Sequence, residues 1–141
     1  MTAPCPLCAL PESAVIWQDD QFSVIDAQEP DYPGFCRVIW RTHQTEMTQL
    51  TQDERQQLMA AVFAVEQVLV DQIGPDKINL ASLGNQVAHI HWHVIPRFTD
   101  DPHFPDAIWA APIRPAGSAQ PISTEQLKTW LRPALIQLTQ K

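Results

Sequence analysis

Three histidines alternate with apolar residues in the segment His89-Ile90-His91-Trp92-His93-Val94-Ile95. Side chains of an extended strand alternate between its two faces, so we expect the three imidazoles on one face and the apolar residues on the other. Protonation of one such ring disfavours protonation of its neighbours, which makes a chance cluster of core histidines a poor explanation. A functional row of imidazoles is favoured, but the pattern alone also fits a metal site, because His-x-His on a strand can place two nitrogens on one zinc ion.

A second pattern with chemical potential is the pair Cys5 and Cys8, which form a Cys-x-x-Cys motif near the N-terminus. The chain has three cysteines, an odd number that cannot form a closed set of disulfides. In a reducing compartment such a pair indicates a metal or redox site. The third, Cys36, stands in the apolar run 34–40 and is expected to be buried as packing.

Short β-like runs precede the first helix and must position some of these residues. Residues 14–17 and 22–25 are expected to form two strands joined by a turn at 18–21, with Asp26 at the end of the second. A third strand is expected over 35–41, and His43 follows it.

Thr51 and Glu54 have the spacing of a capping box. Apolar residues then recur every three or four positions up to Gly74-Pro75, which predicts a long helix. They are Leu58, Val62, Val65, Leu69 and Ile73.

The second half of the chain contains the histidine segment. Strands are expected over 77–83 and 89–95, with a turn at Gly84-Asn85 between them. Residues 99–121 are rich in proline and are expected to form a loop. Ser123 and Gln126 then open a short helix, whose continuation Pro133 should weaken.

This order predicts one α+β domain over residues 1–141, with a core over about 5–110 and a tail and helix over 111–141. Strands on both sides of one long helix favour an antiparallel sheet of about five strands, with the helices packed on one face. The C-terminal helix is expected to be the shorter of the two.

Composition excludes several function classes. A net charge of −7 argues against a partner with a nucleic-acid backbone, which needs clustered Lys and Arg. No apolar run approaches the roughly 20 residues of a membrane span. The N-terminal residues do not contain the basic stretch and following apolar run that would predict a signal peptide. A cytoplasmic location is therefore expected, although a local positive pocket can still bind a small anion.

The segment 89–95 resembles the signature of the histidine triad (HIT) family, in which three histidines alternate with apolar residues. The match is complete over 89–95 and continues into Pro96-Arg97. The Cys-x-x-Cys pair, the expected strand ending in Asp26, the strand before His43 and the long helix occur in the family's order. Residues 79–85, 104–105 and 108–109 look like a bacterial branch. The resemblance implies a HIT-like fold and a nucleotide hydrolase or transferase, such as a dinucleoside polyphosphate hydrolase or an adenosine phosphoramidase.

The resemblance also implies catalytic roles. His91 corresponds to the nucleophile that attacks the α-phosphorus and forms a nucleotidyl-histidine intermediate, which water then hydrolyses. His93 would bind the phosphate oxygens and help to protonate the leaving group. Asp26 corresponds to the residue that binds the ribose hydroxyls.

The same resemblance implies a structural zinc ion held by Cys5, Cys8, His43 and His89. Two thiolates and two imidazoles are a sound tetrahedral set for zinc. A closed site of this kind leaves no position for a reactive water, which weakens the alternative of a metal-dependent hydrolase.

The substrate contacts depart from the family pattern at one position. Gln86 stands where many members have a Ser or Thr that contacts phosphate, and Asn79 and Asn85 are further expected substrate contacts. A nucleotide-binding protein with little or no catalysis therefore stays open beside the enzyme.

The expected partners are a small-molecule nucleotide and, from the resemblance, a second copy of the chain in a homodimer. No nucleic acid and no membrane are expected. His103 is expected at the surface, and Trp109 is placed where it could reach the pocket of a partner subunit.

Overall fold

A five-stranded antiparallel sheet with the strand order β1-β2-β3-β5-β4 forms the centre of the molecule in the computed structural model, which describes residues 4–140. The strands are β1 (Val15–Gln18), β2 (Phe22–Asp26), β3 (Cys36–Trp40), β4 (Lys77–Ala81) and β5 (His91–Arg97). The helices are α1 (Gln52–Ile73) and α2 (Thr124–Thr139), with short 3-10 turns η1 (Glu12–Ala14) and η2 (Met47–Gln49). The expected α+β fold is confirmed. The ends of the expected domain, residues 1–3 and 141, lie outside the described residues.

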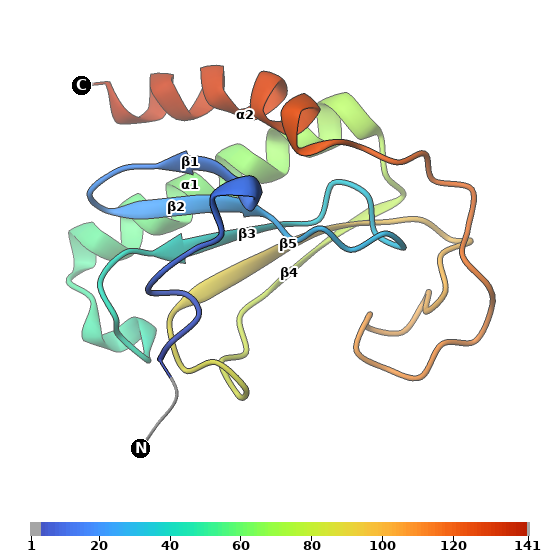
Figure 1. Cartoon of the computed structure of the whole chain (residues 1–141), viewed down its shortest axis with the longest axis horizontal. Coiled ribbons are helices and arrows are strands. Elements are labelled where there is room, and N and C mark those ends of the chain that lie inside the picture. The colour runs from blue at the N-terminus through green and yellow to red at the C-terminus, as the bar shows by residue number, and fades with distance from the viewer. Residues whose placement is uncertain (1–3, 141) are drawn as a thin grey trace.

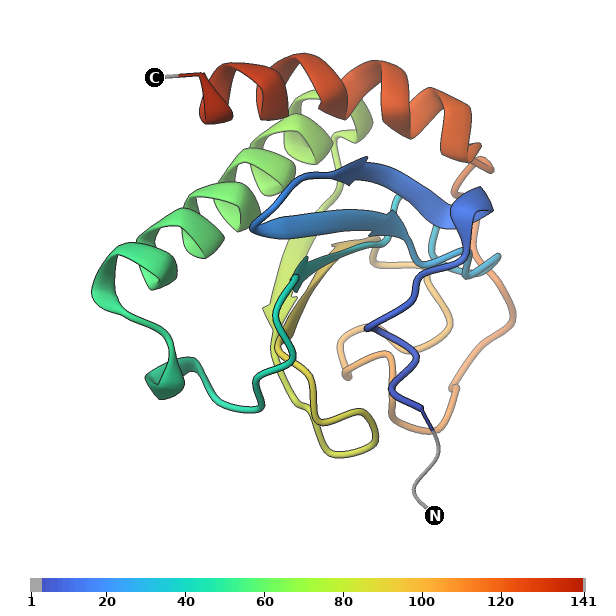
Figure 2. The ribbon, with the colours of Figure 1, turned by 60° about the vertical axis from the view of Figure 1, so that its left-hand side comes forward.

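Both helices pack on one side of the sheet (Figures 1 and 2). α1 contacts β3 and β5, and α2 contacts both α1 and β1. Their buried residues, among them Leu58, Val65 and Leu131, form one apolar core with Val38 and Val94 of the sheet. Neither α1 nor α2 therefore covers the opposite face of the sheet.

Local sequence explains the ends of α1. The backbone N–H of Glu54 donates to Thr51 Oγ1 at 3.1 Å, and the N–H of Thr51 donates to Glu54 Oε1 at 2.8 Å, so the expected capping box is present. Gly74 ends the helix in the left-handed region, at φ 65°, which glycine adopts without steric cost.

α2 is longer than expected, because it continues through Pro133 to Thr139. The proline stands on the exposed face, where water can satisfy the carbonyl that lost its N–H partner. Leu127, Leu131 and Leu135, four residues apart and fully buried, hold the helix on both sides of the proline. Apolar burial thus outweighs the local helix-breaking effect.

The strand bounds in the second half also differ from expectation. β5 begins at His91 rather than His89, and β4 ends at Ala81 rather than Leu83. Residues before β5 bond elsewhere: the N–H of Ile90 donates to the carbonyl of Gln44 at 2.8 Å. The segment 82–90 is therefore a loop that ends on the histidines. Residues 99–121 contain no helix or strand, as expected.

The long loop between β5 and α2 is held by a buried ion pair. Arg97 Nε lies 2.7 Å from Asp101 Oδ2, and both side chains are nearly inaccessible. Burial works to raise the pKa of Asp101, but hydrogen bonds from Arg97 and from the N–H groups of His103 and Phe104 hold it at about 2. His103 is half-buried rather than on the surface, because its ring stacks on Tyr32 and bonds its hydroxyl.

Within residues 4–140, no helix combines the length and the apolar character needed to cross a membrane.

Candidate active site

The sheet register places His91 and His93 on the face opposite the helices. His93 pairs with Arg37 of β3, and His91 pairs with Ile39. The intervening residue Trp92 and the following Val94 face the helical core. His91 and His93 are 8% and 5% exposed, so their rings are largely screened from water.

The ring of His91 is oriented by the backbone just before its strand. Its Nδ1 lies 2.6 Å from the carbonyl oxygen of His89. A carbonyl only accepts hydrogen bonds, so Nδ1 carries the proton and donates it, and Nε2 keeps a free lone pair. His91 is thus arranged as a nucleophile or hydrogen-bond acceptor.

The ring of His93 has the opposite tautomer. Arg37 Nε donates to His93 Nδ1 at 3.4 Å, so the ring proton is on Nε2. The centroids of the His91 and His93 rings are 4.9 Å apart, with their planes at 84°. Burial lowers the pKa of His93 to about 4, and nearby His91 and Arg37 add to the effect. The pair therefore offers one lone pair and one N–H donor, from rings that are only 4.9 Å apart.

His89 precedes the strand and serves a different group. Its Nε2 donates to the carbonyl oxygen of Trp40 at 2.6 Å, which leaves Nδ1 unprotonated. That Nδ1 lies 3.4 Å from Cys5 Sγ and 3.6 Å from Cys8 Sγ. Burial lowers the pKa of His89, which favours the neutral ring that a metal requires.

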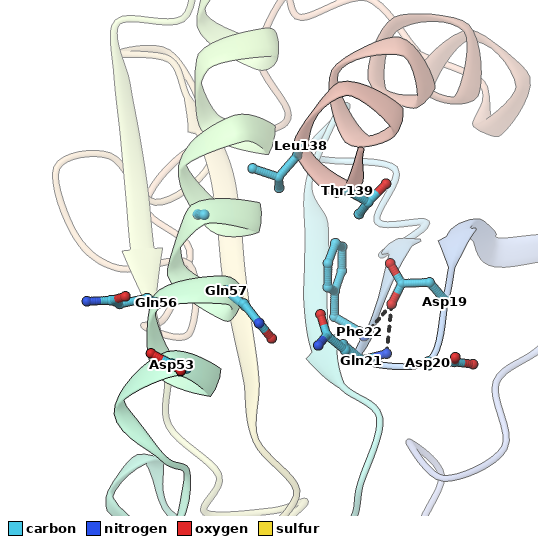
Figure 3. Close-up of a pocket in the computed structure, with 10 residues that line it drawn as sticks. Asp19, Asp20, Gln21, Phe22, Asp53, Gln56, Gln57, Leu138 and Thr139 are labelled. Carbon is cyan, nitrogen blue, oxygen red and sulfur yellow. Dashed lines mark hydrogen bonds between the residues drawn. The ribbon is translucent and has the colours of Figure 1, made fainter. Parts of the chain in front are cut away.

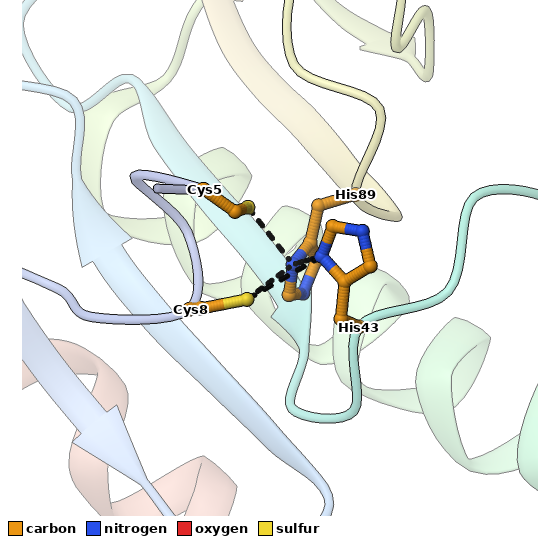
Figure 4. A group of neighbouring side chains, drawn as sticks. All are labelled: Cys5, Cys8, His43 and His89. Carbon is orange, nitrogen blue, oxygen red and sulfur yellow. Dashed lines mark hydrogen bonds between the residues drawn. The ribbon is translucent and has the colours of Figure 1, made fainter. Parts of the chain in front are cut away.

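Four side chains from three separate segments converge at this point, as Figure 4 shows: Cys5, Cys8, His43 and His89. His43 Nδ1 lies 3.4 Å from Cys8 Sγ and 3.2 Å from His89 Nδ1. A tetrahedral zinc ion with ordinary bond lengths would hold sulfur and nitrogen about 3.5 Å apart and two nitrogens about 3.3 Å apart. The donor set and its spacing therefore fit zinc. His91 and His93 stand outside this cluster.

Asp26 lies at the end of β2 and is nearly buried. Its Oδ1 accepts the N–H of Gln28 at 2.8 Å, and its Oδ2 accepts the hydroxyl of Thr124 at 2.6 Å. The carboxylate thus ties β2 to the first residue of α2. In the register Asp26 pairs with Cys36, whose fully buried side chain belongs to the helix-side core, as expected for that cysteine.

The other expected substrate contacts lie on β4 and in the loop after it. Asn79 pairs with Ile95 and its Oδ1 accepts from Arg97 Nη1 at 2.7 Å, so Arg97 holds it in place. Asn85 and Gln86 are exposed in the loop that leads to His89.

Besides His91, the side chains of Arg37, Phe35 and Trp109 contact His93, and only Trp109 was considered as a site residue from the sequence. Arg37 was missed because it stands within an apolar run; the available signal was that it is the single charged residue of that run. Trp109, which from the sequence could reach a partner's pocket, contacts the His93 ring of its own chain, with centroids 5.0 Å apart. Half of the Trp109 side chain remains exposed.

Two cavities differ in position and in the carboxylates that line them, Glu46 alone in one and three aspartates in the other. One of about 310 Å³ lies beside His91, between residues 45–48 before α1 and the loop residues 82–84. A larger groove of about 670 Å³ lies on the helical side, between the β1–β2 turn and the ends of α1 and α2 (Figure 3). The carboxylates of Asp19, Asp20 and Asp53 line that groove and would repel a phosphate. The histidine face is the better place for an anionic ligand.

Comparison with known proteins gives consistent matches. The HIT domain family matches residues 11–100. A histidine triad protein from Marinobacter aquaeolei VT8 is 26% identical, with a TM-score of 0.70 over 89% of this chain and 90% of that chain.

Two more distant structures share the fold. A hypothetical histidine triad nucleotide-binding protein from Sulfolobus tokodaii strain 7 is 20% identical, with a TM-score of 0.64 over 94% of this chain and 92% of that chain. A zinc-bound histidine triad family protein from Mycobacterium smegmatis is 23% identical, with a TM-score of 0.59 over 91% and 87%. The family match covers well over half of the sequence, and the chain belongs to the HIT domain family.

Proposed function

We propose that this protein is a nucleotide hydrolase or transferase that cleaves at the α-phosphate of a nucleoside phosphoramidate or dinucleoside polyphosphate. The observation that carries the proposal is the pair of opposite tautomers at His91 and His93. A free lone pair on His91 Nε2 suits attack on phosphorus, and the N–H on His93 Nε2 suits a phosphate oxygen. The name of the Sulfolobus tokodaii relative, a nucleotide-binding protein, supports the ligand class.

The first step forms a bond from His91 Nε2 to the α-phosphorus and breaks the bond to the leaving group, which takes the electron pair. The His91 ring becomes cationic, and its Nδ1–H remains bonded to the carbonyl of His89 at 2.6 Å, which stabilises that charge. Water then attacks phosphorus and loses a proton to solvent, and the electron pair of the N–P bond returns to Nε2.

His93 acts as a hydrogen-bond donor in this scheme. A ring with a pKa of about 4 is neutral near pH 7, and a neutral imidazole gives up its remaining proton only with great difficulty. His93 therefore stabilises charge on the phosphate oxygens, and a leaving amine takes its proton from solvent. This refines the expectation that His93 protonates the leaving group.

Zinc is proposed as the occupant of the cluster Cys5, Cys8, His43 and His89, which we call the four-ligand cluster. The spacing of its donor atoms and the zinc-bound relative from Mycobacterium smegmatis support this assignment. The ion would be structural: it ties the N-terminal segment to His89, whose carbonyl orients His91. Thiolate ligands suit a reducing compartment, in line with the expected cytoplasmic location.

A homodimer is proposed from the family resemblance and from one surface feature. Phe63 and Val70 of α1 are 53% and 41% exposed and lie seven residues apart, on one face of the helix. An apolar stripe of this kind suits contact with a second copy of the chain.

A nucleotide-binding protein with little catalysis is the second candidate function. The observation that favours it is the exposed side chain of Gln86, a long amide at the position where a compact hydroxyl is common in the family. Such a protein would bind AMP and release no product.

Adenosine 5′-phosphoramidate distinguishes the two candidates. Phosphorus NMR measures the release of AMP. We expect the wild type to release AMP and His91→Ala to release none, although the variant should still bind AMP. Equal release by both proteins would exclude His91 as the nucleophile. Binding of AMP without release by the wild type, also with a dinucleoside polyphosphate, would favour the binding protein.

A further inference from the structure

Arg37 lies at the centre of the sheet, on the face that carries the histidines. It pairs with His93 on one side and with Ile25 on the other. Paired residues of adjacent strands share a face, so the Arg37 side chain shares the face of His91 and His93. The residue is half-buried, and burial lowers the pKa of its guanidinium, although not enough to remove its charge. A charge in this position costs desolvation energy and needs a partner.

The contacts of Arg37 leave most of that charge unpaired. Nε donates to His93 Nδ1 at 3.4 Å, and the guanidinium lies over the Phe35 ring, 5.0 Å from its centroid. The charge of Glu29 works to raise the pKa of Arg37, but among residues 4–140 the carboxylates within ion-pair distance of a basic side chain belong to Asp101 and Glu125, which pair with Arg97 and Lys128. A guanidinium has five N–H donors, and the described contacts of Arg37 use one.

Arg97 provides an internal comparison. It lies on the same face, four residues after His93, and is almost fully buried. Its donors bond Asp101 twice, at 2.7 and 3.0 Å, as well as Asn79 and the carbonyl of Asp106. Arg97 is thus satisfied by protein groups, whereas Arg37 has spare donors beside the reactive pair.

Resting on the function proposed above, we propose that Arg37 is a phosphate-binding and positioning residue: its guanidinium binds phosphate oxygens of the nucleotide, and its Nε–H keeps the His93 proton on Nε2. The arrangement explains how an acidic protein binds an anion. The tautomer of His93 follows directly from Arg37, because a ring nitrogen that accepts a hydrogen bond cannot carry the proton.

Binding of AMP and of adenosine, measured by calorimetry, separates phosphate from nucleoside recognition. We expect Arg37→Met to weaken AMP binding by about 10–100-fold, the range for loss of charge-assisted hydrogen bonds, and to leave adenosine binding within about threefold. Arg37→Lys keeps the charge without the planar guanidinium, so it should recover part of the AMP affinity. Lys77→Met removes one exposed positive charge from the far end of β4 and should leave both affinities unchanged.

The positioning role has a separate readout. Long-range proton–nitrogen NMR of the His93 ring should show the Nε2–H tautomer in the wild type and a mixture of tautomers in Arg37→Met. An unchanged AMP-to-adenosine ratio in Arg37→Met, or an equal loss of both affinities, would overturn phosphate binding by Arg37. An unchanged His93 tautomer would overturn its positioning role. If the wild type binds no AMP and releases none from the phosphoramidate, the proposed function fails and takes this role with it.

Discussion

The first two histidines of the segment 89–95 use the same imidazole side chain in opposite ways. His89 donates from Nε2 to the carbonyl of Trp40 and leaves Nδ1 for the four-ligand cluster. His91, two residues later, donates from Nδ1 to the carbonyl of His89 and leaves Nε2 free. The partner of one ring nitrogen thus decides the role of the other. Residue type gives the chemistry that is available, and the neighbouring backbone chooses among its forms.

This difference predicts that substitutions at His91 or His93 affect turnover, whereas substitutions in the four-ligand cluster affect stability.

His93→Gln removes the ring that contacts Arg37 and lies beside His91. We expect kcat for phosphoramidate hydrolysis to fall by about 10²–10³-fold, because one positioned donor to the phosphate is lost, whereas zinc content stays the same. Steady-state kinetics and metal analysis measure the two quantities. Loss of zinc from this variant would show that the four-ligand cluster depends on the His93 side chain.

Cys8→Ser removes one thiolate from the four-ligand cluster. We expect less bound zinc and a melting temperature lower by roughly 5–10 °C, with kcat reduced less than about tenfold at a temperature where the variant is folded. Cys36→Ala is the matched control, because it removes a buried thiol from outside the cluster and should keep its zinc. A fall in kcat as large as that of His93→Gln would contradict a purely structural ion.

Gln86→Thr tests the departure from the family pattern at the loop before the triad. The side chain is exposed, so the substitution should leave stability unchanged. We expect kcat to change by about two- to fivefold, since a compact hydroxyl adds at most one further contact to phosphate. A gain of about a hundredfold or more would show instead that Gln86 holds the natural protein in a binding role.

The pH dependence of folding should carry the signature of His93. Its pKa is about 4 in the folded state and about 6.5 in an unfolded chain. Between these values the unfolded state binds more protons, so the free energy of unfolding should rise with pH up to about 6.5 and then level off. Stability is therefore lost as the pH falls from about 6.5 towards 4.

Urea unfolding of the wild type and of His93→Gln, across about pH 5–7, measures this contribution. Both proteins keep the four-ligand cluster, so its own pH dependence cancels in the difference. We expect a smaller rise in the variant. Parallel curves would show that His93 is protonated in the folded protein at about the same pH as in the unfolded chain.

Much of this structure follows from local sequence. The capping box of Thr51 and Glu54 and the terminal Gly74 fix the ends of α1, and alternation in 89–95 indicates the strand that carries His91 and His93. The composition of the four-ligand cluster came from family resemblance, and the structure brings all four side chains together. These features depend on neighbouring residues or on a motif.

The features that sequence missed depend on distant contacts. α2 passes Pro133 because leucines on its buried face meet the core, and β5 starts late because residues near 90 bond to the chain after β3. Arg37 is a single charge in an apolar run, and the register shows that it pairs with His93. Asp26 bonds Thr124, which is 98 residues away and whose approach no local pattern predicts.

The proposed function depends on a covalent nucleotidyl intermediate at His91. The most direct test quenches the wild type in alkali during its first turnover of adenosine 5′-phosphoramidate and measures the protein by mass spectrometry. We predict a mass increase of one adenylyl group on the peptide that contains His91, and no such increase in His91→Ala. If His93→Gln slows hydrolysis of the intermediate more than its formation, more of the adduct should accumulate in that variant. Turnover with no adduct at any time, or an adduct on His93, would contradict the account.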